Sequence, residues 1–479
     1  MTYISINYFV LVSIVVLIYY IFPQKYRWTV LLRGSAVFYV LFYKTSWWLI
    51  LGTIIVSYLV GLGVENTFES NKKKLLIVGI IAVVLPWLFT RDLVDLSWGI
   101  IRTNPIKIVA PLGISFYTLQ VIAYMADIYW GKIKAQRNFF QYMLFISFFP
   151  QLLQGPIPRF EQLQWQLIKG HRFDEHKFSK GICYIIWGFF LKLVIADKAG
   201  VFVDNVYNNY PAFVGAYLWV ASILYSIQLY TDFLACTTLA QGVSLLFGID
   251  LIDNFHQPYF AISIKDFWRR WHKSLSSWLK DYIYIPLGGN KKGQSNKYLN
   301  IIITFLVSGL WHGAGFRFIV WGLLHAIYQI VGELTAQIRE DIYARMNVDK
   351  GSRDKKLFKM MGTFLLVNWA WVIFRADSLR QGLGIIKNMI VVFNPWVLFN
   401  DRIYTLGLDL KDFLVLILGI LLLVYVGNKH EQGRSLSNSI LRRKLSIRWT
   451  LMIMGILVVM IFGTYGYGYS ASDFIYGGF

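Results

Sequence analysis

Apolar runs long enough to cross a lipid bilayer recur along the whole chain and constrain its fold more than any other feature. Of its 479 residues, 56% are hydrophobic and only 15% are charged, against about 25% charged in an average soluble chain. A helix that spans a bilayer needs roughly 20 mostly apolar residues. We therefore predict an all-α, polytopic integral membrane protein with one membrane domain over residues 1–479. The expected membrane segments lie near 7–23, 30–45, 47–63, 74–91, 177–196, 212–231, 298–312, 316–334, 359–374, 410–427 and 449–466.

Several of these segments are short, so buried, re-entrant or interfacial helices are expected as well. The first apolar run has no basic residue before Tyr8 and leads directly into further apolar runs. A cleaved signal peptide is therefore not expected. The polar gaps between the runs are too short to fold as a separate soluble domain.

The chain is strongly basic, with 47 Lys and Arg against 26 Asp and Glu, a net charge of +21. The basic residues gather between the apolar runs, where cytoplasmic loops of membrane proteins hold such an excess. Membrane topology and anionic lipid explain most of this charge, and binding of an anionic donor is the alternative. A nucleic-acid partner is not expected. Cys183 and Cys236 lie in apolar surroundings, which indicates neither a disulfide framework nor a zinc site.

Two proline-containing segments interrupt the apolar pattern. Residues 148–159 contain three prolines and a glycine after an apolar run, and they include Gln154. Proline removes a hydrogen-bond donor and blocks the preceding helical turn, and irregular backbone at membrane depth occurs only inside protein or beside water. A broken helix that lines a cavity and a simple exit into a loop both fit this segment. The second segment has Pro111 before a helix expected to carry Ser115, Thr118 and Gln120.

Residues 265–282 combine cations, tryptophans and a histidine at helical spacing. At 100° per residue, one stripe holds Trp268, Trp271, Leu275, Trp278, Leu279 and Tyr282, and the other holds Lys265, Arg269, Arg270, Lys273 and Lys280. This pattern predicts one amphipathic helix in the membrane interface, with the tryptophans at headgroup level. His272 falls at the border of the two faces, where it could face a cavity.

His312 ends the apolar run 301–311 and follows Trp311. An ionisable residue at such a place is a candidate for function. A dry environment penalises the charged imidazolium, and the neutral ring is the form that a general base requires. A core histidine that donates to a carbonyl is the alternative. His325 either supports His312 or only packs, and the scattered histidines give no metal-binding pattern.

A polar seam crosses the apolar stretch near Tyr230 and Asp232. A carboxylate in lipid is costly, so Asp232 should face the interior and have a partner. The seam either lines a substrate pathway or forms a structural hydrogen-bond network.

The most specific motifs resemble those of the membrane-bound O-acyltransferase (MBOAT) family, in particular its bacterial branch for alginate and peptidoglycan O-acetylation. This resemblance implies a ring of about 11 or more membrane helices around a tunnel. It also implies that His312 is the family's near-invariant histidine and His272 its second histidine. The motifs that carry it are Pro111–Tyr117, Phe149–Arg159, Ile195–Asp197, Asn254–Tyr259, Ser263–Asn290, Gly309–Gly313, Trp371–Ala376 and Phe474–Tyr476.

The predicted function is the transfer of an acetyl group from a cytoplasmic thioester, acetyl-coenzyme A, to an extracytoplasmic polysaccharide or partner acetyltransferase. His312 would act as general base, and His272 would orient the donor or stabilise the oxyanion. The predicted substrate-binding residues are Trp268, Arg269, Trp271, Trp311, Tyr230, Asp232 and Gln154. We expect no metal and no tightly bound cofactor.

Three alternatives stay open from the sequence. One is D-alanyl transfer to teichoic acid from a carrier-protein thioester. Another is a transporter for a polysaccharide or lipid intermediate, and the third is a scaffold for an envelope assembly. For each enzyme hypothesis the expected location is the bacterial cytoplasmic membrane.

Overall fold

The computed structural model describes residues 4–42, 47–90, 113–152, 154–313, 315–346, 349 and 351–465, and these form helices without a β-strand. Pro111 and the motif at Phe474–Tyr476 lie outside the described residues. The shorter helical turns are η1 (Gln24–Tyr26), η4 (Tyr210–Ala212), η5 (Pro258–Phe260), η7 (Pro395–Phe399) and η8 (Asp401–Thr405). The α- and π-helices are α1 (Ile6–Ile21), α2 (Arg27–Phe42), α3 (Trp47–Asn66), α4 (Glu69–Thr90), α5 (Ile114–Tyr129), α6 (Phe139–Ser147), α7 (Phe149–Leu152), α8 (Phe160–Lys169), α9 (Glu175–Phe189), η3 (Phe190–Ala196), α10 (Asp197–Asn208), α11 (Ala216–Leu246), α12 (Ile264–Arg270), α13 (Lys273–Leu279), η6 (Lys280–Tyr284), α14 (Gln294–His312), α15 (Phe316–Leu334), α16 (Ala336–Arg345), α17 (Arg353–Arg375), α18 (Leu379–Val391), α19 (Leu410–Glu431), α20 (Leu436–Leu441) and α21 (Leu445–Phe462).

Each of the eleven predicted membrane segments coincides with a helix. Within the described ranges, seven helices are long and apolar enough to cross a membrane, or eight if the bent pair α15 and α16 is one span. Helices α1 and α2 have 16 residues each, which is shorter than a full span. The polytopic all-α class is thus confirmed, with seven or eight candidate spans. A ring of eleven helices around a tunnel stays a prediction.

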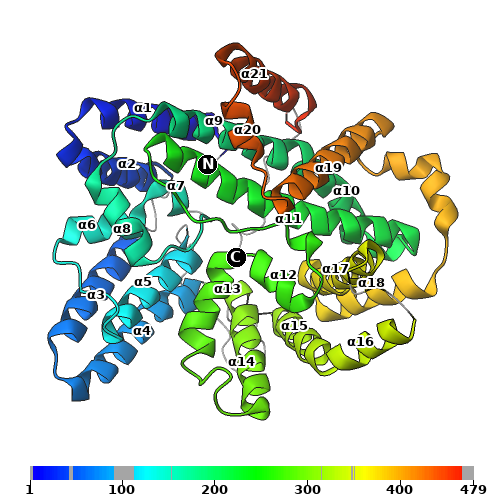
Figure 1. Cartoon of the computed structure of the whole chain (residues 1–479), viewed down its shortest axis with the longest axis horizontal. Coiled ribbons are helices and arrows are strands. Elements are labelled where there is room, and N and C mark those ends of the chain that lie inside the picture. The colour runs from blue at the N-terminus through cyan, green and yellow to red at the C-terminus, as the bar shows by residue number, and fades with distance from the viewer. Residues whose placement is uncertain are drawn as a thin grey trace.

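Helix α11 crosses the middle of the molecule and organises its core. It is 31 residues long, and it contacts α9, α10, η3 and α17. In Figure 1 this green helix runs between the N-terminal helices on one side and α15 to α18 on the other. Its polar seam is therefore enclosed by other helices rather than by lipid.

The prediction of one continuous interfacial helix over 265–282 is wrong. The chain forms α12, leaves the helix at Trp271 and His272, and resumes as α13 and the π-helix η6. Trp271 is 1% exposed and Trp278 is 4% exposed, so both side chains are packed inside the protein and do not form an exposed face that could contact lipid headgroups. Of the cations, Lys265, Arg269 and Lys280 are exposed as expected.

Close packing of α14 against α15 depends on glycine at their crossing. A Cβ atom added at Gly309 would overlap the carbonyl oxygen of Phe318, and one added at Gly322 would overlap that of Phe305. Small residues of this kind allow two membrane helices to approach closely. The crossing fixes the end of α14, where Trp311 and His312 lie, against the first turns of α15.

We predict that Gly309→Ala lowers the free energy of unfolding by about 1–3 kcal/mol, because the added methyl group forces the two backbones apart. Gly332→Ala on α15 is the matched control, since nothing lies within 4 Å of its added Cβ. The control should leave stability unchanged or raise it by up to about 1 kcal/mol, through the helix propensity of alanine. Thermal unfolding of the detergent-solubilised proteins measures the difference, and equal transitions for both variants would contradict the close crossing.

Candidate active site

His272 lies at the break between α12 and α13, in a backbone conformation that is unusual for a histidine. Its φ of 42° and ψ of 56° fall in the left-handed region, which costs of order 1–3 kcal/mol outside glycine. The side chain is 1% exposed. The periodicity placed His272 at the border between two faces of one helix. The break in the helix instead directs the imidazole into the core.

Asn254 holds the His272 ring in one tautomer. Its Oδ1 accepts hydrogen bonds from the Ser274 backbone N–H at 3.1 Å and the Ser274 hydroxyl at 2.8 Å, which fixes the orientation of the amide. The same oxygen lies 3.2 Å from His272 Nδ1. Because an amide oxygen only accepts, Nδ1 carries the proton and Nε2 presents a lone pair. This buried Nε2 has no hydrogen-bond partner in the part of the chain that the structure describes.

Burial lowers the pKa of His272 to about 3, because the core does not solvate a charged imidazolium. The ring is therefore neutral at physiological pH. A neutral imidazole with a bare Nε2 can accept a proton or a hydrogen bond, and in this state it cannot donate one from Nε2.

His312 is the last residue of α14 and lies in an aromatic cluster. It is 2% exposed, and its ring centroid lies 4.9 Å from Trp311, 5.0 Å from Trp321 and 5.3 Å from Phe374. The Trp311 ring also lies 6.0 Å from His272. The fold thus brings the two predicted catalytic histidines to the same tryptophan, although they lie on different helices.

Two of the predicted tryptophans are held by hydrogen bonds. Trp311 donates from Nε1 to the carbonyl of Ser115 at 3.2 Å. Trp268 donates from Nε1 to Nδ1 of His325 at 3.2 Å, and His325 packs 4.9 Å from Trp321. His325, whose role the sequence left open, is therefore part of the same cluster.

The other predicted residues differ in how they relate to this cluster. Trp271 lies 6.1 Å from Tyr230 and 5.0 Å from Trp371, which joins α11 to the aromatic core. Arg269 is exposed on α12, and no contact with the histidines is observed for it. Gln154 is 2% exposed, in the irregular segment after α7.

Asp232 has the buried partner that the sequence required. Lys192 on the π-helix η3 lies 2.7 Å from Asp232 and 2.8 Å from Asp197, and all three side chains are at most 4% exposed. One lysine therefore bridges two carboxylates between η3, α10 and α11. This contact supports the structural-network interpretation of the seam.

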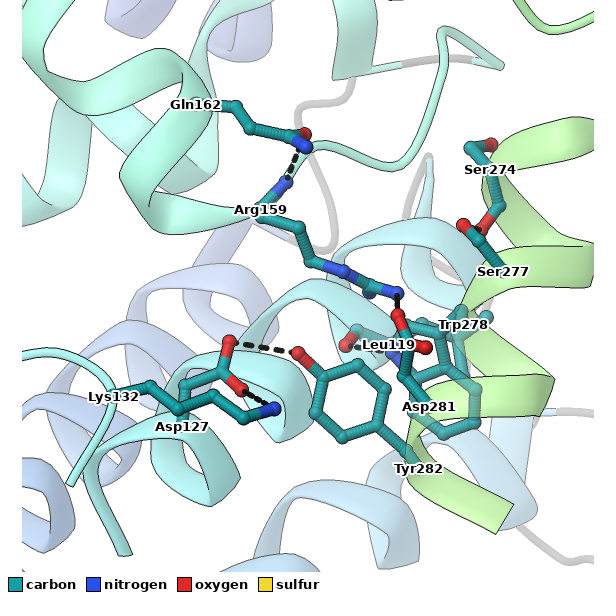
Figure 2. Close-up of polar contacts among 10 residues, drawn as sticks. All are labelled: Leu119, Asp127, Lys132, Arg159, Gln162, Ser274, Ser277, Trp278, Asp281 and Tyr282. Atoms are coloured by element: carbon teal, nitrogen blue, oxygen red, sulfur yellow. Dashed lines mark hydrogen bonds and ion pairs between the residues drawn. The ribbon is translucent and has the colours of Figure 1, made fainter. Parts of the chain in front are cut away.

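A second polar network holds the irregular segment 154–159 beside α5 and α13. Arg159 pairs with Asp281 at 2.9 Å, and the Tyr282 hydroxyl donates to Asp127 at 2.7 Å. Figure 2 shows Tyr282 and Lys132 converging on Asp127 while Arg159 reaches across to Asp281. Trp278 adds a hydrogen bond from Nε1 to the Leu119 carbonyl at 2.8 Å. These contacts join the proline-rich segment, α5 and the helices after His272 into one unit.

Sequence analysis identified both histidines but missed the residue that orients one of them. In the sequence, Asn254 and Phe374 stood out only as members of the motifs Asn254–Tyr259 and Trp371–Ala376, and Trp321 only as a residue one turn before His325. The sequence signal that could have identified Asn254 is its position as a polar residue directly before an aromatic-rich turn. Among the described residues no group of three or more His, Cys, Asp or Glu side chains could hold a metal ion.

An ionisable side chain buried inside a bundle of membrane helices marks a candidate functional site, because such burial is costly. The family model of "MBOAT, membrane-bound O-acyltransferase family" matches residues 133–352, a range that contains His272 and His312. "Probable alginate O-acetylase AlgI" of Pseudomonas putida is 34% identical over 417 residues, covering 83% of this chain and 82% of that protein. The chain belongs to the membrane-bound O-acyltransferase family.

Two further relatives show the range of substrates in this family. The "Peptidoglycan O-acetyltransferase" of Helicobacter pylori is 34% identical over 403 residues, covering 77% of this chain and 74% of that protein. The "Teichoic acid D-alanyltransferase" of Bacillus subtilis is 31% identical over 264 residues, covering 52% of this chain and 65% of that protein. Membership in this family makes the protein an O-acyltransferase of the bacterial cytoplasmic membrane.

We predict that Lys192→Met destabilises the protein by about 3–5 kcal/mol, because it leaves two buried carboxylates without their cation. Lys72→Ala is the control: its partner Glu69 has a side chain that is 87% exposed, and such a surface pair contributes about 0–1 kcal/mol. Unfolding in detergent measures both variants. Similar losses for the two would show that the buried pairing is not needed for stability.

We also predict a pH dependence of stability that originates at His272. The pKa is about 3 in the folded protein and about 6.5 in the unfolded chain. Between these values the unfolded chain binds a proton that the folded protein does not. Stability should therefore fall as the pH drops from about 6.5 toward 3, by up to about 1.4 kcal/mol per pH unit from this residue.

His272→Gln should flatten this dependence, whereas His176→Gln, at an exposed position in the first turn of α9, should not. Unfolding of each variant between pH 4 and pH 7.5 provides the measurement. An unchanged slope in His272→Gln would mean that the imidazole is not held neutral in the folded protein.

Proposed function

We propose that this O-acyltransferase moves an acetyl group from a cytoplasmic thioester, acetyl-coenzyme A, to a hydroxyl group on the outer side of the membrane. The acceptor hydroxyl belongs to an envelope or secreted polysaccharide, or to a partner acetyltransferase. The observation that carries this proposal is the convergence of His272 and His312 on Trp311 in a buried aromatic cluster. Relatives named for alginate and peptidoglycan O-acetylation support the choice of an acetyl group and a polysaccharide.

In the proposed reaction His312 acts as the general base. Its imidazole takes the proton from the acceptor hydroxyl while the hydroxyl oxygen attacks the thioester carbonyl carbon. The tetrahedral intermediate then expels the thiolate as the carbon–sulfur bond breaks. The imidazolium returns the proton to sulfur, so that an ester and a free thiol are the products.

His272 is assigned the orientation of the donor. Its Nε2 lone pair accepts a hydrogen bond, which suits an N–H group of the thioester donor. The oxyanion role considered from the sequence requires a donor at this atom, which the tautomer held by Asn254 does not provide. His272 therefore orients the donor and does not stabilise the oxyanion in the proposed reaction.

The burial of His312 sets a requirement for this mechanism. Its ring is covered by Trp311, Trp321 and Phe374, so substrates reach it only when aromatic side chains move apart. Closure around the reactants then excludes water, which protects the thioester from hydrolysis. The proposed reaction also requires two openings in the protein, one through which the donor enters from the cytoplasm and one through which the acceptor enters from outside.

D-alanyl transfer from a carrier protein is the second candidate, and the Bacillus subtilis relative favours it. Its donor is also an acyl thioester, so the same base chemistry would serve. Assays with acetyl-coenzyme A alone and with a D-alanyl carrier protein distinguish the two candidates, because each donor should support turnover in only one case.

We predict that His312→Ala lowers acetyl transfer by about 10²–10⁴-fold, the usual contribution of a positioned base. Protein in proteoliposomes, supplied with acetyl-coenzyme A and polysaccharide, would be assayed for released thiol and acetylated product. His176→Ala serves as the control because this histidine is exposed in the first turn of α9. Near-normal turnover by well-folded His312→Ala protein would overturn the assignment. A transporter, in contrast, would move substrate without forming any acyl product.

A further inference from the structure

A small cavity lies between α5 and the irregular segment that follows α7. Its walls include Phe116, Tyr117 and Gln120 of α5, together with Gln151 and the segment 155–158. About 10 Å³ of free volume remains inside, which is close to what one water or one hydroxyl group needs. Of the two interpretations open for residues 148–159, the one in which the segment lines a cavity agrees with these walls.

The cavity wall has an unsatisfied hydrogen-bond acceptor. Gln151 is 4% exposed, and its Oε1 has no hydrogen-bond partner in the described ranges of the chain. Its Nε2 makes a long contact of 3.4 Å with the Phe145 carbonyl, which also accepts from Gln120 at 2.8 Å. Gln154, three residues later, has a second buried Oε1 without a partner among the described residues. A buried amide oxygen of this kind needs a donor.

The side chains that line the cavity indicate which chemical group it can bind. None of the described residues that line the cavity is charged, so none of them offers a cation to pair with a phosphate group. A thioester carbonyl and its sulfur only accept hydrogen bonds and cannot satisfy Gln151 Oε1. An alcohol donates one hydrogen bond and needs little volume, which matches both the acceptor atom and the size.

The cavity also lies next to the candidate active site. The ring of Phe116, which lines the cavity, lies 6.3 Å from the His272 ring and 5.6 Å from the Trp311 ring. A hydroxyl group beside Gln151 is thus separated from the histidine cluster by one aromatic side chain.

We propose that this cavity is the subsite for the acceptor alcohol, with Gln151 Oε1 accepting a hydrogen bond from an acceptor hydroxyl. This assignment rests on the proposed function, since it names where the acceptor binds. The hydroxyl comes from a sugar of a polysaccharide or from a serine of a partner protein, and both sources present the same group.

The test uses the full-length protein in proteoliposomes with acetyl-coenzyme A. Two acceptors are compared: an oligosaccharide and a serine-containing peptide. Gln151→Met removes the amide oxygen at similar volume, and Gln151→Leu, which also removes it, is the second variant in case the first fails to fold. Ser244→Ala is the control, because it removes a buried, unpartnered hydroxyl on α11, and Ser244 is not a residue that lines the cavity.

Loss of one hydrogen bond to the acceptor should raise its KM about tenfold. The KM for acetyl-coenzyme A should stay the same, and Ser244→Ala should match the wild type. The acceptor whose KM rises identifies the source of the hydroxyl.

Two results would overturn the subsite. A higher KM for acetyl-coenzyme A with unchanged acceptor KM would place the donor's pantetheine amides in the cavity. Unchanged kinetics in both well-folded variants would mean that the cavity holds only a structural water. Failure of the proposed function is recognised separately, because the wild-type protein would then transfer no acetyl group.

Discussion

Hydrocarbon offers no hydrogen bonds, so a buried charge inside the helix bundle needs a partner from the protein itself. Lys192 lies between Asp197 and Asp232, so these charges are paired without help from water. Asn254 likewise serves the Ser274 hydroxyl, the Ser274 backbone and the His272 ring with a single oxygen. The helices that carry these groups are therefore joined by specific contacts in addition to apolar packing.

Burial in the protein also sets the protonation state of His272. Burial keeps the His272 imidazole neutral, and Asn254 decides which nitrogen bears the proton. Aromatic rings then surround both histidines and exclude water. An acyl thioester is sensitive to hydrolysis, so a closed and dry cluster suits transfer to an alcohol better than an open channel would. The left-handed backbone at His272 is the local cost of turning this side chain inward.

The helical segments were predictable because long apolar runs have few alternatives in a bilayer. Each of the eleven predicted segments overlaps a helix within the described residues, although α1, α2 and α14 do not meet the length and hydropathy of full spans. The prediction failed at 265–282, where every residue is compatible with one helix by periodicity. Burial of Trp271 against Trp371 and Tyr230 favours the break, and those partners lie far away in the sequence.

The amino-acid sequence by itself determined the membrane class, the helical segments, the two histidines and the family motifs, because each of these depends on local composition or spacing. The tertiary structure alone decided that Trp311 lies beside both histidines, that Lys192 pairs with Asp232, and that Asn254 orients His272. It also decided that Gln151 borders a cavity near Phe116. The physical reason is that these contacts join residues of different helices, and helix packing depends on the shapes of all the side chains at each crossing.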